Sequence, residues 1–136
     1  MYLYKVREDG RPAEINYAGP DEEQVTFTLP GDEVAYWRKA NQIHDYFVKK
    51  VQDGNDDCGE YPVTTDDLKL LYKLCRQALV DRNPEILPPC EGFFFGSTEV
   101  DAWYWENLID TVIMLHPLIQ PKVYEHGAEY VYSSSW

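Results

Sequence analysis

The chain has 136 residues, of which 24 are acidic and 12 are basic, giving a formal net charge of −12, and 15% are aromatic. This length predicts a single domain over residues 1–136 that can bury a substantial core, and the aromatic content excludes a disordered chain. The three cysteines exclude a fully paired disulfide framework, and the apolar stretches are too short to cross a bilayer. Because residues 1–7 also lack the pattern of a signal peptide, we expect a cytoplasmic protein.

Residues 1–32 are predicted to form strands and loops. Residues 2–6 alternate in character as a strand does, and residues 24–29 are rich in β-branched and aromatic side chains. The residues that mark loops between these two strands are Gly10, Pro12, Gly19 and Pro20.

The middle of the chain carries two predicted helices. Apolar residues recur at helical spacing from residue 33 to residue 52, and the first helix is expected over this range. The second begins at residues 64–67, where a hydroxyl N-cap is followed by acids that favour the positive end of a helix dipole. The pair Asn83 and Pro84 then ends it.

A third helix and a closing strand complete the predicted fold. The helix follows residues 96–98, and Pro117 ends it. Residues 128–132 have the composition of a strand. Residues 33–136 therefore form the main helical part with a closing strand. The whole chain is predicted to be an α+β domain in which three helices pack on a small antiparallel sheet.

The first candidate site is a polar cluster on the helix expected over residues 33–52. Asn41 and His44 are three residues apart and share a helix face, and Arg38 lies three residues before Asn41. An imidazole titrates near neutral pH, so His44 is a candidate proton shuttle. The alternative is a histidine at the border of the apolar stripe that bonds to a neighbouring side chain.

The second candidate site is the acidic loop at residues 51–61. Asp53, Asn55 and Asp57 alternate as in a calcium-binding loop, but the glycine and the bidentate glutamate of such a loop are not at the required positions. We therefore expect no metal here. The acidic and amide side chains are predicted to fold back onto backbone amides of the loop itself.

The third candidate site is the aromatic and glycine-rich segment at residues 91–105. Three successive phenylalanines centred on Phe94 cannot all face one core in an extended chain, because side chains alternate. Gly96, Ser97 and Thr98 then lead into a predicted helix N-terminus, whose free amides form an anion site. An aromatic wall beside an anion site suits a nucleotide-like ligand. The alternative is an ordinary buried strand followed by a turn and a helix cap.

The negative charge is concentrated toward the C-terminus. Residues 84–136 hold eight acidic residues and a single basic one, Lys122. Such a surface repels phosphate backbones, so we expect no direct nucleic-acid binding. It can attract a basic protein partner or imitate nucleic acid, or it can serve solubility alone.

Four motifs stand out as a combination: YWRKANQIH at 36–44, QDGNDDC at 52–58, GFFFGSTE at 92–99 and SSW at 134–136. Together they resemble a family of small proteins encoded by bacteriophages and prophages, for which no mechanism is established. The resemblance covers residues 34–136. It implies a phage context and a location in the cytoplasm of a host bacterium, and it supplies no catalytic residue and no cofactor.

Three functions are consistent with these features. In the first, which we favour, the three candidate sites form one pocket for a nucleotide-like ligand, such as a host immune signal that a phage counter-defence protein sequesters. In the second, the acidic C-terminal half inhibits a basic host protein that normally binds nucleic acid, as anti-CRISPR proteins of the DNA-mimic type do. In the third, His44 and Cys58 act in a small hydrolase.

The favoured function is binding rather than catalysis, with no metal, no cofactor and no membrane involved. The terminal Trp136 either packs onto the domain or serves self-association. The predicted ligand-binding residues are Arg38, Asn41, His44, Asp57, Tyr61, Phe94, Gly96, Ser97 and Thr98.

Overall fold

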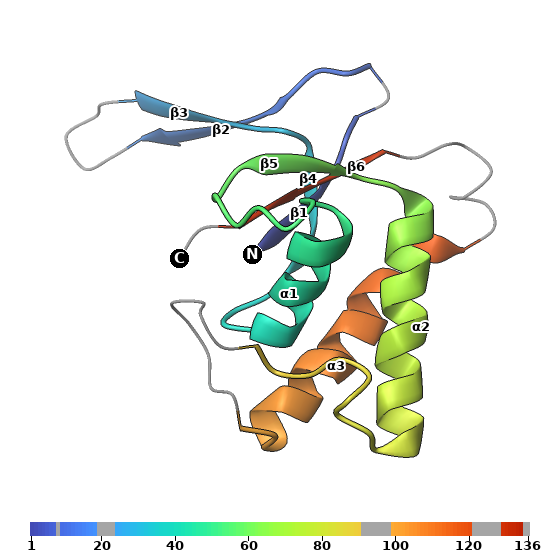
Figure 1. Ribbon diagram of the computed structural model, residues 1–136. Helices are drawn as coiled ribbons and strands as arrows, with labels where there is room; N and C mark the ends of the chain where they lie inside the picture. The colour runs from blue at the N-terminus through green and yellow to red at the C-terminus, as the bar shows by residue number, and fades with distance from the viewer. Residues whose placement is uncertain (8, 19–23, 91–98, 121–128, 135–136) are drawn as a thin grey trace.

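The computed structural model describes residues 1–7, 9–18, 24–90, 99–120 and 129–134. These residues form a four-stranded antiparallel sheet, a two-stranded sheet and three α-helices, and the predicted α+β class is confirmed (Figure 1). The elements in chain order are β1 (Tyr2–Lys5), β2 (Ala13–Ala18), β3 (Gln24–Leu29), β4 (Asp32–Tyr36), α1 (Asn41–Lys50), β5 (Glu60–Val63), α2 (Thr65–Asp81), α3 (Ala102–Leu115), the short 3₁₀ helix η1 (His116–Ile119) and β6 (Tyr130–Ser133).

The four-stranded sheet places β1 and β6 side by side at its centre. Its order is β4-β1-β6-β5, and each neighbouring pair is antiparallel. Leu3 of β1 lies opposite Tyr132 of β6, and Tyr132 lies opposite Tyr61 of β5. Because Leu3 and Tyr132 are both fully buried, this face of the sheet belongs to the core.

Three helices cover one face of this sheet (Figure 1). Helix α1 contributes Ile43 and Phe47, both without solvent exposure, and the Phe47 ring stacks on Tyr132 with 3.9 Å between ring centroids. Helix α2 buries one stripe at a spacing of three or four residues, made of Leu68, Leu71, Cys75 and Ala78. The opposite side of α2 therefore remains available to solvent.

Helix α2 begins where the sequence predicts. The Thr64 hydroxyl accepts a hydrogen bond from the Asp67 N–H at 3.1 Å, and the Asp67 carboxylate accepts one from the Thr64 N–H at 3.0 Å. This reciprocal capping box satisfies two backbone donors at the helix N-terminus. The helix ends at Asp81, and Arg82 follows in the left-handed conformation, just before the predicted stop.

The first predicted helix begins too early. Asp32–Tyr36 is strand β4, which pairs with β1, and α1 starts only at Asn41. Ala35 and Trp37 are buried on either side of the exposed Tyr36, which is the two-residue period of a strand. So short a segment fits both periods, and pairing with β1 decides between them.

Two strands lie where the sequence predicts loops. Strand β2 pairs with β3 in a hairpin that extends away from the rest of the fold, and β5 follows the acidic loop and pairs with β6 (Figure 1). The formation of each of these strands depends on its partner strand more than on its own composition.

None of the helices within the described ranges is long and apolar enough to cross a bilayer.

Gly31 lies where the chain entering β4 meets the end of β1, and its exchange for alanine should destabilise the protein. A Cβ at this position would lie 2.1 Å from the carbonyl oxygen of Lys5. Because the clash is with backbone, relief requires β1 and β4 to move apart. We expect Gly31→Ala to lower the free energy of unfolding by about 3 kcal/mol, as measured by urea denaturation.

Gly54 provides the control for this prediction. A Cβ there meets nothing within 4 Å, so only the φ of +82° opposes alanine, at a cost of about 1 kcal/mol. A loss for Gly31→Ala no larger than that for Gly54→Ala would contradict the close approach of β1 and β4.

Candidate functional site

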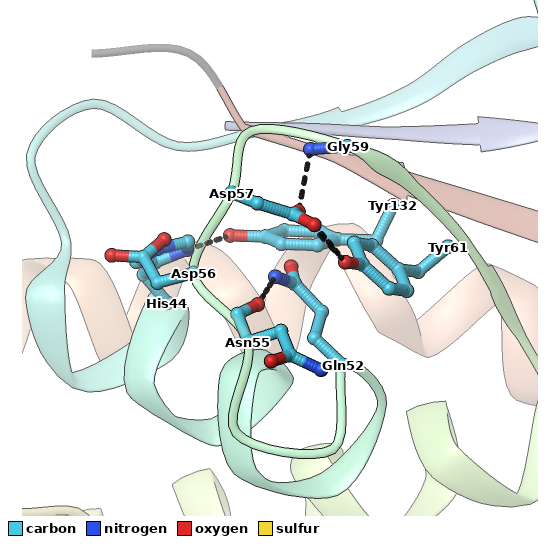
Figure 2. A network of polar contacts seen from close by, with 8 residues as sticks. All are labelled: His44, Gln52, Asn55, Asp56, Asp57, Gly59, Tyr61 and Tyr132. Atoms are coloured by element: carbon cyan, nitrogen blue, oxygen red, sulfur yellow. Dashed lines mark hydrogen bonds and ion pairs between the residues drawn. The ribbon is translucent and has the colours of Figure 1, made fainter.

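A buried histidine links α1, β6 and the acidic loop (Figure 2). His44 has no solvent exposure; its Nδ1 lies 2.6 Å from the Tyr132 hydroxyl, and its Nε2 lies 2.7 Å from a carboxylate oxygen of Asp56. A neutral ring satisfies both contacts when the Tyr132 hydroxyl donates to Nδ1 and Nε2–H donates to Asp56. The network thus joins residues that are 88 and 12 positions from His44 in the sequence.

The surroundings of His44 favour its neutral form. Burial is the largest effect and lowers the pKa of His44 below its ordinary value of 6.5, while the hydrogen bond and the charge of Asp56 offset burial only in part. Burial also raises the pKa of the Tyr132 hydroxyl, which stays protonated and able to donate. A general base must reach the proton that it removes, so this enclosed imidazole acts as a structural bridge.

The loop between α1 and β5 is held by its own polar side chains (Figure 2). The Gln52 amide donates to the Asn55 carbonyl at 2.5 Å, and the Asp57 carboxylate accepts from the Gly59 N–H at 3.0 Å and from the Tyr61 hydroxyl at 2.7 Å. The bond from Tyr61 is the main reason why the pKa of Asp57 is lowered. The predicted fold-back onto backbone amides is found at Asp57.

The described part of the chain holds no group of three His, Cys, Asp or Glu side chains that could bind a metal.

The structure brings together only some of the predicted ligand-binding residues. Asn41 is buried, and its side-chain oxygen accepts a backbone N–H at 3.2 Å; His44 is buried as well, whereas Arg38 is exposed. Asp57 and Tyr61 bond to each other at the protein surface. Asn41 and His44 therefore serve internal contacts. The predicted residues outside the described ranges are Phe94, Gly96, Ser97 and Thr98.

The helix after these residues begins later than the sequence predicts. Helix α3 starts at Ala102, and its N-cap is Asp101, whose carboxylate accepts the Tyr104 N–H at 3.1 Å. A carboxylate thus already occupies the positive end of this helix. Asp101 therefore places a negative charge at this end of α3 and satisfies one backbone donor of its first turn.

A concave surface on α2 gathers positive charge that the sequence analysis does not single out. This α2 cavity has a volume of about 760 Å³ and runs along the exposed side of the helix next to η1. Lys69, Lys73 and Arg76 line it, and their spacing of four and three residues places them on one side of the helix. The sequence signal that could reveal this site is the row of basic residues on the side of α2 opposite its buried apolar stripe.

Aromatic and apolar side chains complete the α2 cavity. The Tyr72 ring centroid lies 5.9 Å from the guanidinium carbon of Arg76, a cation–π contact. The Tyr72 hydroxyl lies 3.2 Å from Nδ1 of His116, at the start of η1. Ile119 of η1 and apolar residues of α2 add hydrophobic lining, and Asp81 lies at the cavity as well. The cavity therefore combines cations with a flat ring and an apolar wall.

Comparison of the chain with models of protein families, with curated proteins and with solved structures finds no match. The His44 network is enclosed, and its side chains satisfy one another. The α2 cavity is open and charged, and it is the feature of the two that can receive a ligand.

The lowered pKa of His44 predicts a loss of stability in mild acid. Near pH 6.5 the unfolded chain binds a proton on His44 that the folded protein does not yet bind. This contribution to stability is full above that pH and falls as the pH drops toward the folded pKa. We expect the free energy of unfolding to decrease as the pH falls below about 6.5, by at most about 1.4 kcal/mol per pH unit. In urea titrations His44→Gln should show a flatter dependence, and an unchanged slope would contradict the assignment.

Tyr130 and Tyr132 provide a matched pair within one strand. Both rings are buried, but among the residues that the structure describes the Tyr130 hydroxyl has no hydrogen-bond partner, whereas that of Tyr132 bonds to His44. Tyr132→Phe leaves Nδ1 of His44 without its donor, so we expect a loss of about 1–3 kcal/mol in urea unfolding. Tyr130→Phe removes an unsatisfied group and should leave stability unchanged or raise it. Equal losses in the two variants would contradict the network.

Proposed function

We propose that the protein binds a small nucleotide-like ligand in the α2 cavity. The observation that carries this proposal is the placement of Lys69, Lys73 and Arg76 beside an aromatic ring in a cavity of about 760 Å³. The formal net charge of the whole protein is −12. A protein this negative repels anions on average, so a compact positive cluster is needed wherever an anion binds.

Each part of such a ligand has a counterpart in the α2 cavity. Lysine and arginine side chains bind phosphate oxygens, and arginine does so with paired N–H donors. The Tyr72 ring and the apolar wall that includes Ile119 provide surface for a flat base. The volume also lies within the roughly 300–1,000 Å³ that is typical of small-molecule sites.

A second groove supports ligand binding less well. It lies between α1 and the segment after α2, has a volume of about 300 Å³ and includes Tyr46 and Lys49 in its lining. Lys49 already forms an ion pair with Asp45 at 2.9 Å. The positive charge of this groove is thus partly neutralised by Asp45, and the α2 cavity is larger and gathers more cations.

The phage resemblance suggests what binding would achieve. A binder made during infection removes a signalling nucleotide from solution in proportion to its own abundance, and it needs no catalytic group. We therefore propose a counter-defence protein in the cytoplasm of a host bacterium that sequesters an immune signal. The enclosure of His44, with both ring nitrogens engaged, favours binding over the hydrolase alternative.

An acidic inhibitor of a basic host protein is the second candidate function. One observation favours it: within the described residues 99–120, which include α3, there are four carboxylates and no lysine or arginine. Asp101 caps α3, so a test by charge reversal should avoid that residue and use the exposed Glu106 and Asp110. Retained inhibition after their reversal would exclude this function.

Titration with ATP, cyclic AMP and a cyclic dinucleotide tests the proposed ligand site. We expect at least one of them to bind, with heat measured by calorimetry and amide shifts along α2 measured by NMR. Lys73→Glu combined with Arg76→Glu should weaken binding at least about tenfold, because the phosphate loses two cations and meets two carboxylates.

Lys39→Glu combined with Lys50→Glu is the matched control. Both lysines are exposed and lie outside the α2 cavity, and the change in net charge is the same. This variant should bind the nucleotide nearly as the original protein does. Equal weakening in both double variants, or no binding of any of the three nucleotides by folded protein, would overturn the proposed function.

A further inference from the structure

Helix α3 exposes a row of large apolar side chains. Trp103 and Ile109 are each 45% exposed, and Ile113 is 63% exposed. Ile109 and Ile113 are four residues apart and share one side of the helix, and Glu106 and Asp110 precede them by three residues each. Apolar side chains gathered on one helix in this way mark an interaction surface. We call these five residues the α3 face.

The surface that covers the α3 face must be apolar and positively charged, because the face carries carboxylates and no cation. The protein itself presents such a surface. In the α2 cavity, the three cations flank Leu70 and Val80, which are 37% and 75% exposed. The two surfaces are thus complementary in charge and alike in apolar character.

We propose that two copies of the protein form a dimer in which the α3 face of each copy packs into the α2 cavity of the other. On one molecule these surfaces are neighbours, because Tyr72 of the cavity contacts His116 at 3.2 Å. His116 begins η1 directly after α3 and follows Ile113 of the α3 face by three residues. A two-fold axis can therefore form both contacts at once and close the dimer.

Helix lengths and charge screening are compatible with this dimer. Helices α2 and α3 have 17 and 14 residues, or about 26 and 21 Å at about 1.5 Å per residue, so they can pack along most of their length. The net charge of −12 on each copy opposes association. Screening over about 8 Å at physiological salt limits that repulsion, while ion pairs in contact are screened less.

The dimer would place α3 of one copy over the proposed ligand site of the other. A nucleotide and a second copy then exclude each other, and the nucleotide shifts the protein toward the monomer by mass action. Only this competition rests on the proposed function. Dimerisation itself requires no ligand.

Sedimentation velocity at physiological salt, from about 10 µM to about 1 mM protein, tests the dimer. The original protein should change from monomer to dimer over this range. Glu106→Lys with Asp110→Lys, and separately Lys73→Glu with Arg76→Glu, should each weaken dimerisation at least tenfold. Mixed in equal amounts, the two variants should form a 1:1 complex, because their charges are again complementary. That recovery also shows that both variants are folded.

The direction of the effect separates specific contacts from general repulsion. Reversing Glu106 and Asp110 makes the protein less negative, so repulsion alone predicts stronger association, whereas the proposal predicts weaker association. Glu14→Lys with Glu85→Lys, at exposed positions elsewhere, is the matched control and should dimerise at least as well as the original protein.

Three results would overturn the dimer: an original protein that stays monomeric up to about 1 mM, an unweakened Glu106→Lys/Asp110→Lys variant, or no complex in the mixture. The Glu106→Lys/Asp110→Lys variant keeps the α2 cavity unchanged, so nucleotide titration of its monomer tests the proposed ligand site independently of the dimer.

Discussion

The arrangement of the helices on the sheet depends on how one buried imidazole is satisfied. His44 lies in the core, where an unpaired polar group is costly, and it is matched on one side by Tyr132 and on the other by Asp56. Tyr132 also stacks on Phe47, one turn after His44 on the same helix. A single side chain of β6 therefore makes both a polar and an apolar contact with α1, and Asp56 ties the acidic loop to the same imidazole (Figure 2).

Local signals were enough to predict the elements that depend on their own sequence. Strand β3 and the capped start of α2 are of this kind, because composition and capping act within a few residues. The start of α1 and strand β5 depend on partner strands far along the chain, which a local pattern does not contain. The same limit applies to His44: the sequence allows a bond from its ring to another side chain, but only the fold identifies Tyr132 as that partner.

Polar residues that look functional in a sequence can instead make buried contacts that stabilise the fold. Asn41 and His44 share a helix face and are both enclosed. The cations of the α2 cavity attract less notice, because they lie in a chain with twice as many acids as bases. Their significance comes from position: Lys73 and Arg76 lie opposite a buried stripe, whereas α3 carries acids on its exposed side. The α2 cavity thus gathers three cations beside one acid, Asp81, whereas α3 carries no cation.

The pairing of β1 with β6 has a consequence for biosynthesis. Leu3 and Tyr132, which face each other in the sheet, are 129 residues apart. At roughly 5–20 residues per second, a ribosome needs roughly 6–26 s to make the second strand after the first. During that time β1 can pair only with β4, and β5 has no neighbouring strand in the sheet. The His44 ring also lacks the Tyr132 hydroxyl as its hydrogen-bond donor. A chain that lacks β6 would lose all three contacts together, so the four-stranded sheet and the His44 network can form only after β6 has been made.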